Sequence, residues 1–431
     1  MDSLSEAFLS VKNLWVEYSS NKKAVHAVNG VSFDLEKGGS LGIVGESGCG
    51  KSTISKAILR ILPDNGARIS GGEIWYKGRN LADMPEEELE KIRGAEISMI
   101  FQDPMTALNP VKRILSQVSS VIRLHNKGMT KADAEKRAIA MLKTVGISED
   151  RVRDYPHQFS GGMQQRVEVA IGLSCHPDLL LADEPTTALD VTIQAQVLDL
   201  IHDLMNERGT SLILITHNLG IVAEMCDYVA VLYGGEIIEY GSKREIFKNP
   251  CHPYTIGLFG AIPSMTSDGE RLKPIEGVMP EPSDLPDGCK FHPRCPYATE
   301  ECSRGFTPGM DDWAAAEEGF TVTLAGDTFM PGGELAEGES RAEAGVYTWT
   351  ESDSVTWTLR LRKDGGYTLS KADGPDTVAE YSGKTWTCGG GVVRCSPLLG
   401  VIPVVELGGT HRCQCHRIEA VKAANRKEVE V

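Results

Sequence analysis

A glycine-rich loop enclosed by a strand and a helix constrains the fold of this chain more than any other feature. The loop is Gly45–Ser52, with the sequence Gly-Glu-Ser-Gly-Cys-Gly-Lys-Ser. Before it, Ser40–Val44 is a short apolar run that predicts a buried strand, and after it Ser52–Leu62 predicts a helix ended by Pro63. A glycine turn without a ligand rarely has both flanking elements, so the order predicts a P-loop α/β fold.

The same loop carries the chemistry of a nucleoside triphosphate site. Its glycines allow backbone N–H groups to turn toward phosphate oxygens, and the N-terminus of the following helix adds positive potential. We expect Lys51 to contact the β- and γ-phosphates and the Ser52 hydroxyl to ligate Mg²⁺, which makes ATP with Mg²⁺ the expected ligand. The expected nucleotide-binding residues of this stretch are Gly45, Glu46, Ser47, Gly48, Cys49, Gly50, Lys51, Ser52 and Thr53.

A pair of carboxylates after a second buried strand supplies the other half of the site. Leu179–Ala182 is an apolar run that ends in Asp183 and Glu184. We expect Asp183 to reach the metal through water, and Glu184 to polarise the attacking water as a general base. An acidic strand end that merely faces solvent is the simpler interpretation, but the upstream P-loop argues against it.

Strands alternate with helices over residues 1–255, which predicts a mostly parallel sheet covered on both faces. Residues from about 103 to 165 differ, since their pattern is largely helical, as in Lys131–Val145. We therefore expect a helical subdomain inserted into the α/β core. The further expected strands are Ile97–Phe101, Leu212–Thr216 and Val229–Tyr233.

Composition excludes several classes of protein. The 431 residues include 41% hydrophobic and 24% charged residues, typical of a soluble globular protein of two or three domains. A formal net charge of −16 argues against a nucleic-acid partner, because such proteins usually present a basic surface. We expect no signal peptide, and no run approaches the roughly 20 apolar residues of a membrane helix. If this protein works at a membrane, partner proteins must dock it there.

The segment Ser160-Gly161-Gly162-Met163-Gln164 resembles the signature motif of ABC-type ATPases. In that family the signature binds the terminal phosphate of ATP held by a facing subunit, so the resemblance implies two ATPase subunits closed around two ATP molecules. Backbone N–H groups and a hydroxyl at a helix start suit a phosphate. By order and spacing, the resemblance implies further roles: Gln102 as the Q-loop glutamine near Mg²⁺, Asp190 as the D-loop residue, His217 as the switch histidine and Tyr18 as the residue that stacks on adenine. The implied catalytic residues are Glu184, His217 and Lys51.

Two later stretches narrow the resemblance. Asn249–Thr255 and Gly288–Pro296 are similar to the C-terminal extension of dipeptide/oligopeptide/nickel importer ATPases. Membership implies an ATP-hydrolysing subunit, peripheral at the cytoplasmic face of the inner membrane, that powers uptake of di- or oligopeptides or of a related solute such as nickel. The implied partners are a second ATPase subunit, identical or paralogous, two transmembrane permeases and an extracytoplasmic solute-binding protein.

Seven of the eleven cysteines follow residue 285, and in a reducing compartment such clustering favours a metal over disulfides. The family resemblance implies a [4Fe–4S] cluster, with Cys413 a rival for its fourth ligand. Zinc bound by three or four of these thiolates, with His292 or His416, is an alternative, and unliganded thiols are another. The implied iron–sulfur ligands are Cys289, Cys295, Cys302 and Cys415.

Residues 311–400 depart from the family pattern. Residues 355–362 alternate apolar and polar side chains, and a turn at Asp364–Gly366 separates them from a second expected strand, Tyr367–Ser370. We interpret the segment as a small antiparallel β insertion with a docking or regulatory role and no catalytic one. Its Cys388 and Cys395 form a second ligand pair or merely pack. The expected domains are a nucleotide-binding domain 1–255, a cysteine-rich extension 256–310 and 401–431, and this insertion 311–400.

Two other functions fit parts of the sequence. A soluble ABC ATPase acting on nucleic acid or ribosomes would need coiled-coil arms, tandem nucleotide domains or a basic surface, and none is evident. A metal-sensing regulator with a vestigial nucleotide site is disfavoured by the intact Lys51, Glu184 and His217. Glu168 stands where an apolar residue is common in the family, and the sequence suggests no function for it.

Overall fold

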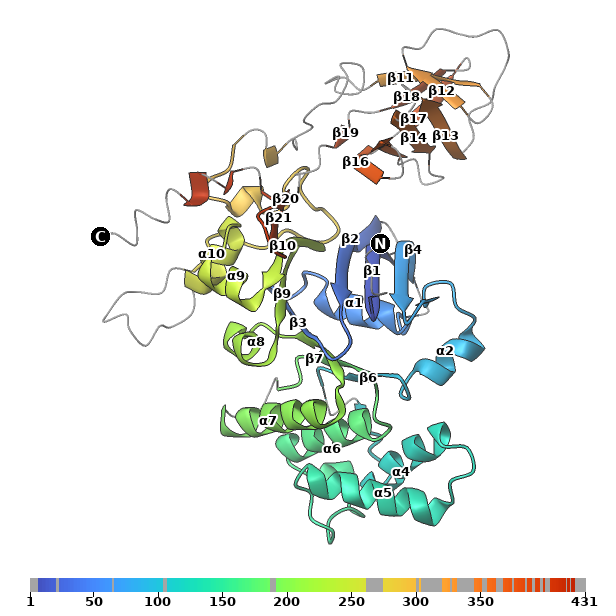
Figure 1. The fold of residues 1–431 in the computed structure, drawn as a ribbon, viewed down its shortest axis with the longest axis vertical. Helices are drawn as coiled ribbons and strands as arrows, with labels where there is room; N and C mark the ends of the chain where they lie inside the picture. The colour runs from blue at the N-terminus through green and yellow to red at the C-terminus, as the bar shows by residue number, and fades with distance from the viewer. Residues whose placement is uncertain are drawn as a thin grey trace, which may run out of the picture. The chain divides into compact units, whose positions relative to one another are not determined.

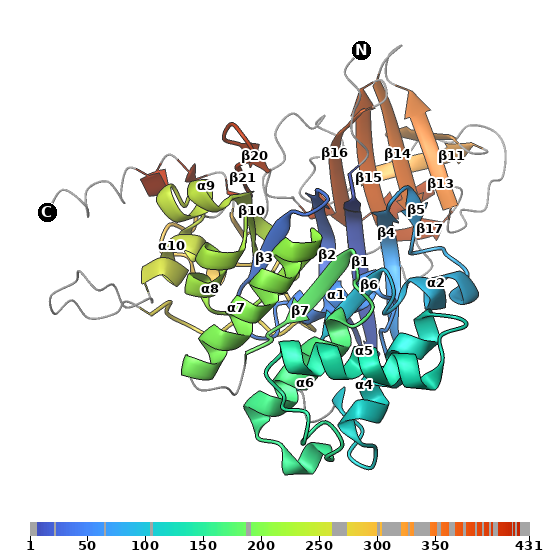
Figure 2. The ribbon, with the colours of Figure 1, turned by 60° about the horizontal axis from the view of Figure 1, so that its bottom comes forward.

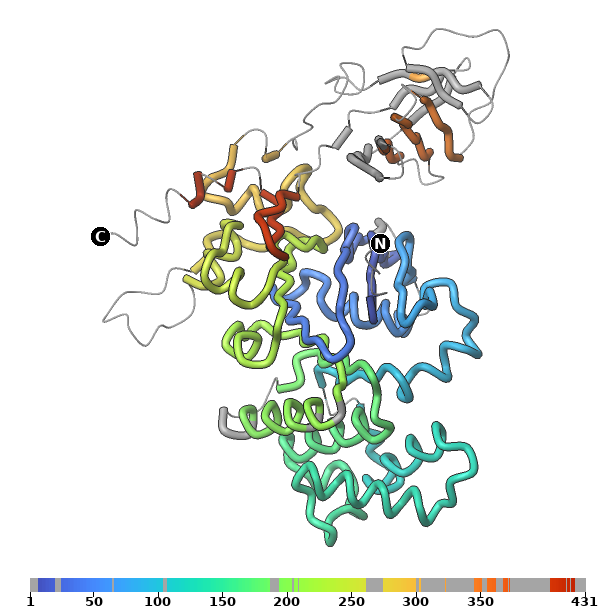
Figure 3. Tube along the Cα trace, in the orientation of Figure 1, coloured from blue at the N-terminus to red at the C-terminus, as the bar shows by residue number. Residues whose placement is uncertain are grey.

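The computed structural model describes most of the first 299 residues and parts of the rest (Figure 3). The described residues are 7–20, 23–63, 66–103, 107–186, 191–260, 274–299, 302–303, 320–325, 328–331, 345–350, 355–361, 367–373, 376–383, 386–389, 392–395, 398–399, 404–415, 417–418 and 420–422. The chain forms two compact units. The first contains residues 1–274, 279–284 and 406–413, and the second contains 275–278, 285–405 and 414–431.

The first unit is built on an eight-stranded sheet whose central strands are parallel (Figure 1). In sheet order the strands are β20 (Val405–Glu406), β21 (Arg412–Cys413), β10 (Glu236–Ser242), β9 (Tyr228–Tyr233), β3 (Ser40–Val44), β8 (Ser211–Ile215), β7 (Leu179–Asp183) and β6 (Ile97–Ile100). The strands from β9 to β6 run parallel, whereas β10 is antiparallel to both of its neighbours β9 and β21. β3, β7 and β8 are buried along their whole length, as expected for strands covered on both faces. The predicted P-loop α/β fold is confirmed.

A four-stranded antiparallel sheet, which is not among the predicted elements, completes the core of this unit. Its strands in order are β2 (Lys23–Leu35), β1 (Leu9–Ser20), β4 (Ala67–Tyr76) and β5 (Arg79–Asn80). Apolar side chains of this sheet, such as Leu9 and Ile74, share one buried cluster with Leu41 and Ile43 of β3. The same cluster contains Ile54 of the helix that follows the P-loop, so both sheets and this helix position the loop together.

Helices lie against the central sheet and form a separate group beyond β6 and β7 (Figures 1 and 2). The group contains α4 (Ile114–His125), α5 (Lys131–Thr144), η1 (Pro156–Gln158) and α6 (Gly161–Leu173), and α6 packs against α4, α5 and β6. The other helices in the described part of the unit are α1 (Lys51–Ile58), α2 (Glu86–Ile92), α7 (Val191–Arg208), α8 (Leu219–Met225), α9 (Lys243–Lys248) and α10 (Pro253–Gly260). None of the helices in the described part of the chain has the length and apolar character needed to cross a membrane.

The helix after the P-loop is shorter than predicted. It was expected to continue to Leu62, but α1 ends at Ile58. Arg60 has a positive φ of 50°, a left-handed conformation that cannot continue an α-helix. Its guanidinium group donates to the carbonyl oxygens of Leu81 and Met84, and this tertiary contact accompanies the early end of the helix.

The second unit contains a nine-stranded sheet. In order its strands are β17 (Trp386–Gly389), β18 (Val392–Cys395), β11 (Phe320–Ala325), β12 (Thr328–Pro331), β13 (Gly345–Thr350), β14 (Val355–Leu361), β15 (Tyr367–Asp373), β16 (Asp376–Gly383) and β19 (Leu398–Leu399). The predicted pair β14 and β15 is antiparallel and buries Trp357, Leu359 and Leu369. The sheet is not wholly antiparallel as predicted, because β12 and β13 pair in parallel at Thr328 and Thr348. The expected turn at 364–366 lies outside the described residues.

Candidate active site

Four parallel strands of the central sheet end beside one another, and each is followed by a residue predicted to act in the site. The P-loop follows β3, Gln102 follows β6, Asp183 ends β7 with Glu184 next, and His217 follows β8. Because the carboxyl ends of parallel strands lie at the same edge of a sheet, residues far apart in the sequence converge there.

The P-loop is packed closely against the sheet. A Cβ atom on Gly45 would lie 2.2 Å from the carbonyl oxygen of Leu232 in β9, so glycine is required at this position. The opposite end of the loop is also supported, because Gly235 donates its N–H to the Cys49 carbonyl at 3.1 Å. Lys51 is buried, and its Nζ donates to the carbonyl oxygens of Gly45 and Glu46, both at 2.8 Å.

Oxygen ligands suited to Mg²⁺ lie together at the start of α1. The Ser52 hydroxyl donates to Asp183 Oδ1 at 2.9 Å, and Asp183 is buried. Burial raises the pKa of Asp183, while the hydrogen bond from Ser52 opposes this shift. Hydroxyl and carboxylate oxygens are the donors that Mg²⁺ prefers, so the residues present fit the ion.

Glu184 joins two of the predicted site residues. Its Oε2 accepts a hydrogen bond from Gln102 Nε2 at 3.0 Å, and its Oε1 lies 3.3 Å from His217 Nδ1. Glu184 also has a left-handed φ of 47°, a conformation that costs roughly 1–3 kcal/mol and persists mainly at functional sites. Its N–H donates to the Ile215 carbonyl at 2.8 Å, which holds this backbone geometry. The general base predicted from sequence therefore contacts both the Q-loop and the switch histidine.

Tyr18 and the signature segment are placed by different parts of the unit. The Tyr18 hydroxyl lies 3.3 Å from Thr53 Oγ1, so its ring stands beside the start of α1. Ser160 is the N-cap residue of α6, and neither its side chain nor Gly161 is buried. Gln164 is buried instead and donates to the Pro156 carbonyl at 2.8 Å, fixing the helix start. The D-loop residue Asp190 lies outside the described residues.

The cysteine ligands predicted from the resemblance lie in the second unit. Cys289 donates its N–H to the Cys302 carbonyl at 2.8 Å, and a 3₁₀ turn η2 (His292–Arg294) leads to Cys295. Burial, and in addition the neighbouring Cys415 and Cys302 thiols, raise the pKa of Cys295 to about 11. The rival Cys413 is buried in β21 of the first unit. The side chains of Cys388, Cys395 and His416 lie outside the described part of the structure.

Sequence reasoning missed Tyr254, which contacts the P-loop directly. Its hydroxyl accepts a hydrogen bond from the Glu46 N–H at 2.9 Å. The stretch Asn249–Thr255 marked only a family resemblance, and no local pattern indicates that one of its side chains reaches a loop about 200 residues earlier in the chain.

Comparisons with known proteins decide the family. The chain matches the family model described as ABC transporter over residues 28–187, and that described as oligopeptide/dipeptide transporter, C-terminal region, over residues 238–302. It is 49% identical to the dipeptide transport ATP-binding protein of Bacillus subtilis (strain 168) over 307 residues, 71% of this chain and 91% of that protein. The chain belongs to the ABC transporter family.

Further matches agree with this assignment. The oligopeptide transport ATP-binding protein of Escherichia coli (strain K12) is 49% identical over 312 residues, 71% of this chain and 92% of that protein. A dimeric ATP-binding cassette solved in a post-hydrolysis state with ADP and Pi aligns with a TM-score of 0.51 at 29% identity, covering 55% of this chain and 99% of that one. This ABC ATPase therefore hydrolyses ATP, and these matches give no support to a role on nucleic acid or ribosomes.

Proposed function

We propose that this ABC ATPase powers the import of dipeptides or oligopeptides through partner membrane permeases. The observation that carries this proposal is the extent of the match, since the chain spans more than nine-tenths of two relatives named as dipeptide and oligopeptide transport ATP-binding proteins. The second family region, residues 238–302, bears the name of the same transporters. Nickel or another small solute is the alternative cargo.

The first step is nucleotide binding by the P-loop. Backbone N–H groups of Gly45–Ser52 and the N-terminus of α1 receive the phosphates, and Tyr18 stacks on the adenine beside Thr53. The ammonium group of Lys51 keeps its hydrogen bonds to the Gly45 and Glu46 carbonyl oxygens and contacts the β- and γ-phosphates with its remaining donor. Ser52, Asp183 and Gln102 would hold Mg²⁺, and the ion would neutralise charge on the phosphates.

The second step is hydrolysis, with Glu184 as the general base. Its carboxylate accepts the proton of the attacking water, while Gln102 and His217, both in contact with it, orient the carboxylate toward the γ-phosphate. The signature Ser160–Gln164 at the start of α6 contributes its N–H groups to the γ-phosphate of a facing subunit, with Asp190 at that interface. Two subunits, identical or paralogous, therefore close on two ATP molecules and transmit closure to the permeases.

Co-expression with the permeases tests the cargo and the partners together. We propose that the chain binds two permease subunits at the cytoplasmic face of the inner membrane, so it should copurify with them. Its ATP hydrolysis should rise severalfold when a peptide-loaded extracytoplasmic binding protein is added. The Glu184→Gln variant is the control, because it should assemble equally but show no stimulation. Stimulation by RNA or ribosomes instead of peptide would overturn the proposal.

For the cysteines of the second unit we propose a [4Fe–4S] cluster held by Cys289, Cys295, Cys302 and Cys415. The thiols of Cys302 and Cys415 act electrostatically on Cys295, so thiol donors gather around it, and thiolates are the usual ligands of such clusters. Zinc bound by three or four of these thiolates is the alternative.

Visible absorption of the anaerobically purified protein tests this proposal. Wild-type protein should show the broad iron–sulfur absorption, and Cys415→Ser should lose it. Cys175→Ser, in the first unit, is the matched control and should keep the absorption. A colourless wild-type protein that contains stoichiometric zinc, or no metal at all, would contradict the cluster, and loss of colour in Cys413→Ser alone would reassign the fourth ligand.

A further inference from the structure

A tyrosine of the C-terminal family region supports the P-loop from outside. Tyr254 in α10 is fully buried, and its hydroxyl accepts the hydrogen bond from the Glu46 backbone N–H at 2.9 Å. Its ring packs edge-on against Tyr233 of β9, with 4.7 Å between ring centroids. Burial raises the pKa of Tyr254, so the hydroxyl stays protonated at neutral pH. The ring and the hydroxyl of Tyr254 are therefore both held in place by neighbouring residues.

The contact determines the orientation of one peptide unit. The Glu46 N–H and the Gly45 C=O belong to the same planar peptide and point in opposite directions. The Gly45 carbonyl accepts a hydrogen bond from Lys51 Nζ at 2.8 Å. The Tyr254 hydroxyl thus orients, through one rigid peptide, the carbonyl that holds the ammonium group of Lys51.

The start of α10 is itself held by a buried carboxylate of β10. Glu239 accepts hydrogen bonds from the backbone N–H groups of Cys251 at 2.7 Å and His252 at 2.9 Å. His252 Nδ1 in turn accepts from the Tyr254 N–H at 3.1 Å. Burial lowers the pKa of His252 to about 4, so its imidazole is neutral and able to accept. These bonds fix the backbone at the start of α10, from which the Tyr254 side chain reaches the Glu46 N–H.

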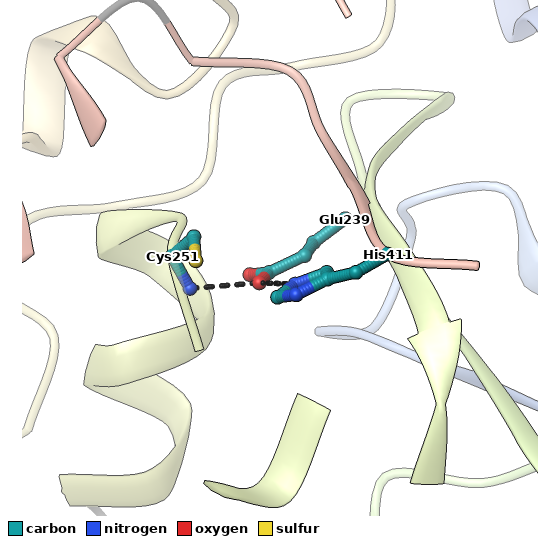
Figure 4. A group of neighbouring side chains, drawn as sticks. All are labelled: Glu239, Cys251 and His411. Atoms are coloured by element: carbon teal, nitrogen blue, oxygen red, sulfur yellow. Dashed lines mark hydrogen bonds and ion pairs between the residues drawn. The ribbon is translucent and has the colours of Figure 1, made fainter. Parts of the chain in front are cut away.

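A segment from the far end of the chain completes this network (Figure 4). His411 lies beside Glu239, with 2.8 Å between Nε2 and Oε1, and both side chains are buried. Glu239, Cys251 and His411 have ligand atoms within 4.8 Å of one another, but N–H donors already occupy the carboxylate, so hydrogen bonding accounts for the group. Residues 406–413 are thereby attached to the helix that carries Tyr254.

We propose that Tyr254 is a positioning residue of the ATP site, which orients the Gly45–Glu46 peptide and through it Lys51, and that His411 stabilises it from the C-terminal segment. The proposal rests on the ATP-binding role of the P-loop. It adds that the C-terminal family region acts on nucleotide binding within the same chain. Removal of the Tyr254 hydroxyl should therefore weaken ATP binding while the fold persists.

A double-mutant cycle on the full-length chain tests this inference. Tyr254→Phe keeps the ring and removes the hydroxyl, and we expect about tenfold weaker binding of a fluorescent ATP analogue. In the Lys51→Ala background the same substitution should change affinity by less than about twofold, because the group it positions is gone. His411→Ala should weaken ATP binding in the same direction by a smaller factor.

Controls separate this proposal from loss of stability and from failure of the ATP site. Tyr240→Phe removes another buried hydroxyl of the same unit, 3.5 Å from the Asp34 carbonyl, and should leave ATP affinity unchanged. Thermal unfolding of each variant confirms that it is folded at the assay temperature. Wild-type protein that binds no ATP would refute the ATP site itself. An unchanged affinity in Tyr254→Phe, or an equal loss with and without Lys51, would overturn the positioning role.

Discussion

Glu168 in α6 provides a quantitative test of the structure through its pH dependence. The side chain is buried, 3% exposed, and contacts the backbone of Phe101, the residue before Gln102. Its Oε1 accepts from the Phe101 N–H at 2.6 Å, and its Oε2 accepts from Gln165 Nε2 at 3.3 Å. Burial raises the pKa of Glu168 from 4.5 to about 7; the Phe101 hydrogen bond opposes this shift and the nearby Asp103 adds to it.

The sign of the effect follows from proton binding. Between pH 4.5 and about 7 the folded state binds more protons at Glu168 than the unfolded state, so the free energy of unfolding falls as pH rises. Each pKa unit corresponds to about 1.4 kcal/mol, which gives a cost of about 3 kcal/mol above pH 7. About 2.5 kcal/mol of this cost develops between pH 5 and pH 8.

Glu168→Gln should remove this dependence. The amide is uncharged at every pH, and its oxygen still accepts from Phe101. Its NH₂ group can donate to Gln165 Oε1 once the Gln165 amide rotates, because this buried oxygen has no hydrogen-bond partner among the residues that the structure describes. The test is urea unfolding at pH 5, 6, 7 and 8, read from the transition that added ATP shifts, because that transition belongs to the unit with the ATP site. From pH 5 to pH 8 the free energy of unfolding of the variant should rise by about 2.5 kcal/mol relative to wild type.

A matched control and a clear contrary result complete the test. Glu207→Gln changes an exposed glutamate of α7 in the same unit and should leave the pH profile as in wild type. If the difference between Glu168→Gln and wild type stays constant from pH 5 to pH 8, the carboxyl is not buried as described, and the account of its environment is wrong.

Three further predictions concern the catalytic cycle and the insertion. Glu184→Gln should retain ATP binding but lose roughly 10²–10³-fold in turnover and accumulate as a closed dimer on size exclusion; normal turnover would remove Glu184 as the base. Ser160→Arg should abolish turnover while leaving the ATP affinity of the monomer unchanged, because the signature serves the facing subunit; weaker monomer binding would contradict that division. Deletion of residues 311–400 should preserve basal ATP hydrolysis, and collapse of activity in a folded variant would refute a purely docking or regulatory role.

Much of the candidate nucleotide site could be predicted because short stretches of sequence contain the residues that its chemistry needs. A buried strand followed by glycines and Lys51 specifies a P-loop, and an apolar strand ending in Asp183 and Glu184 specifies its partner. Parallel pairing of β3, β7 and β8 then brings these strand ends together, as expected for strands linked by helices. Side-chain contacts such as that of Glu184 with His217 follow from that topology.

Pairings that depend on distant segments could not be predicted in the same way. The antiparallel sheet requires β1 to lie between β2 and β4, an arrangement that leaves no local pattern beyond ordinary strand character. The end of α1 is accompanied by hydrogen bonds from Arg60 to carbonyl oxygens of a later segment, which helix propensity alone does not predict.

The sequence by itself determined the ATP chemistry, because lysine, serine and carboxylate side chains at set spacings have few other uses in that order. Only the tertiary structure decided what supports this chemistry. A backbone N–H such as that of Glu46 is identical in almost every residue, so nothing in the sequence shows that Tyr254 bonds to it. Packing of α10 against β9, and attachment of His411 to Glu239, create that contact across the length of the chain.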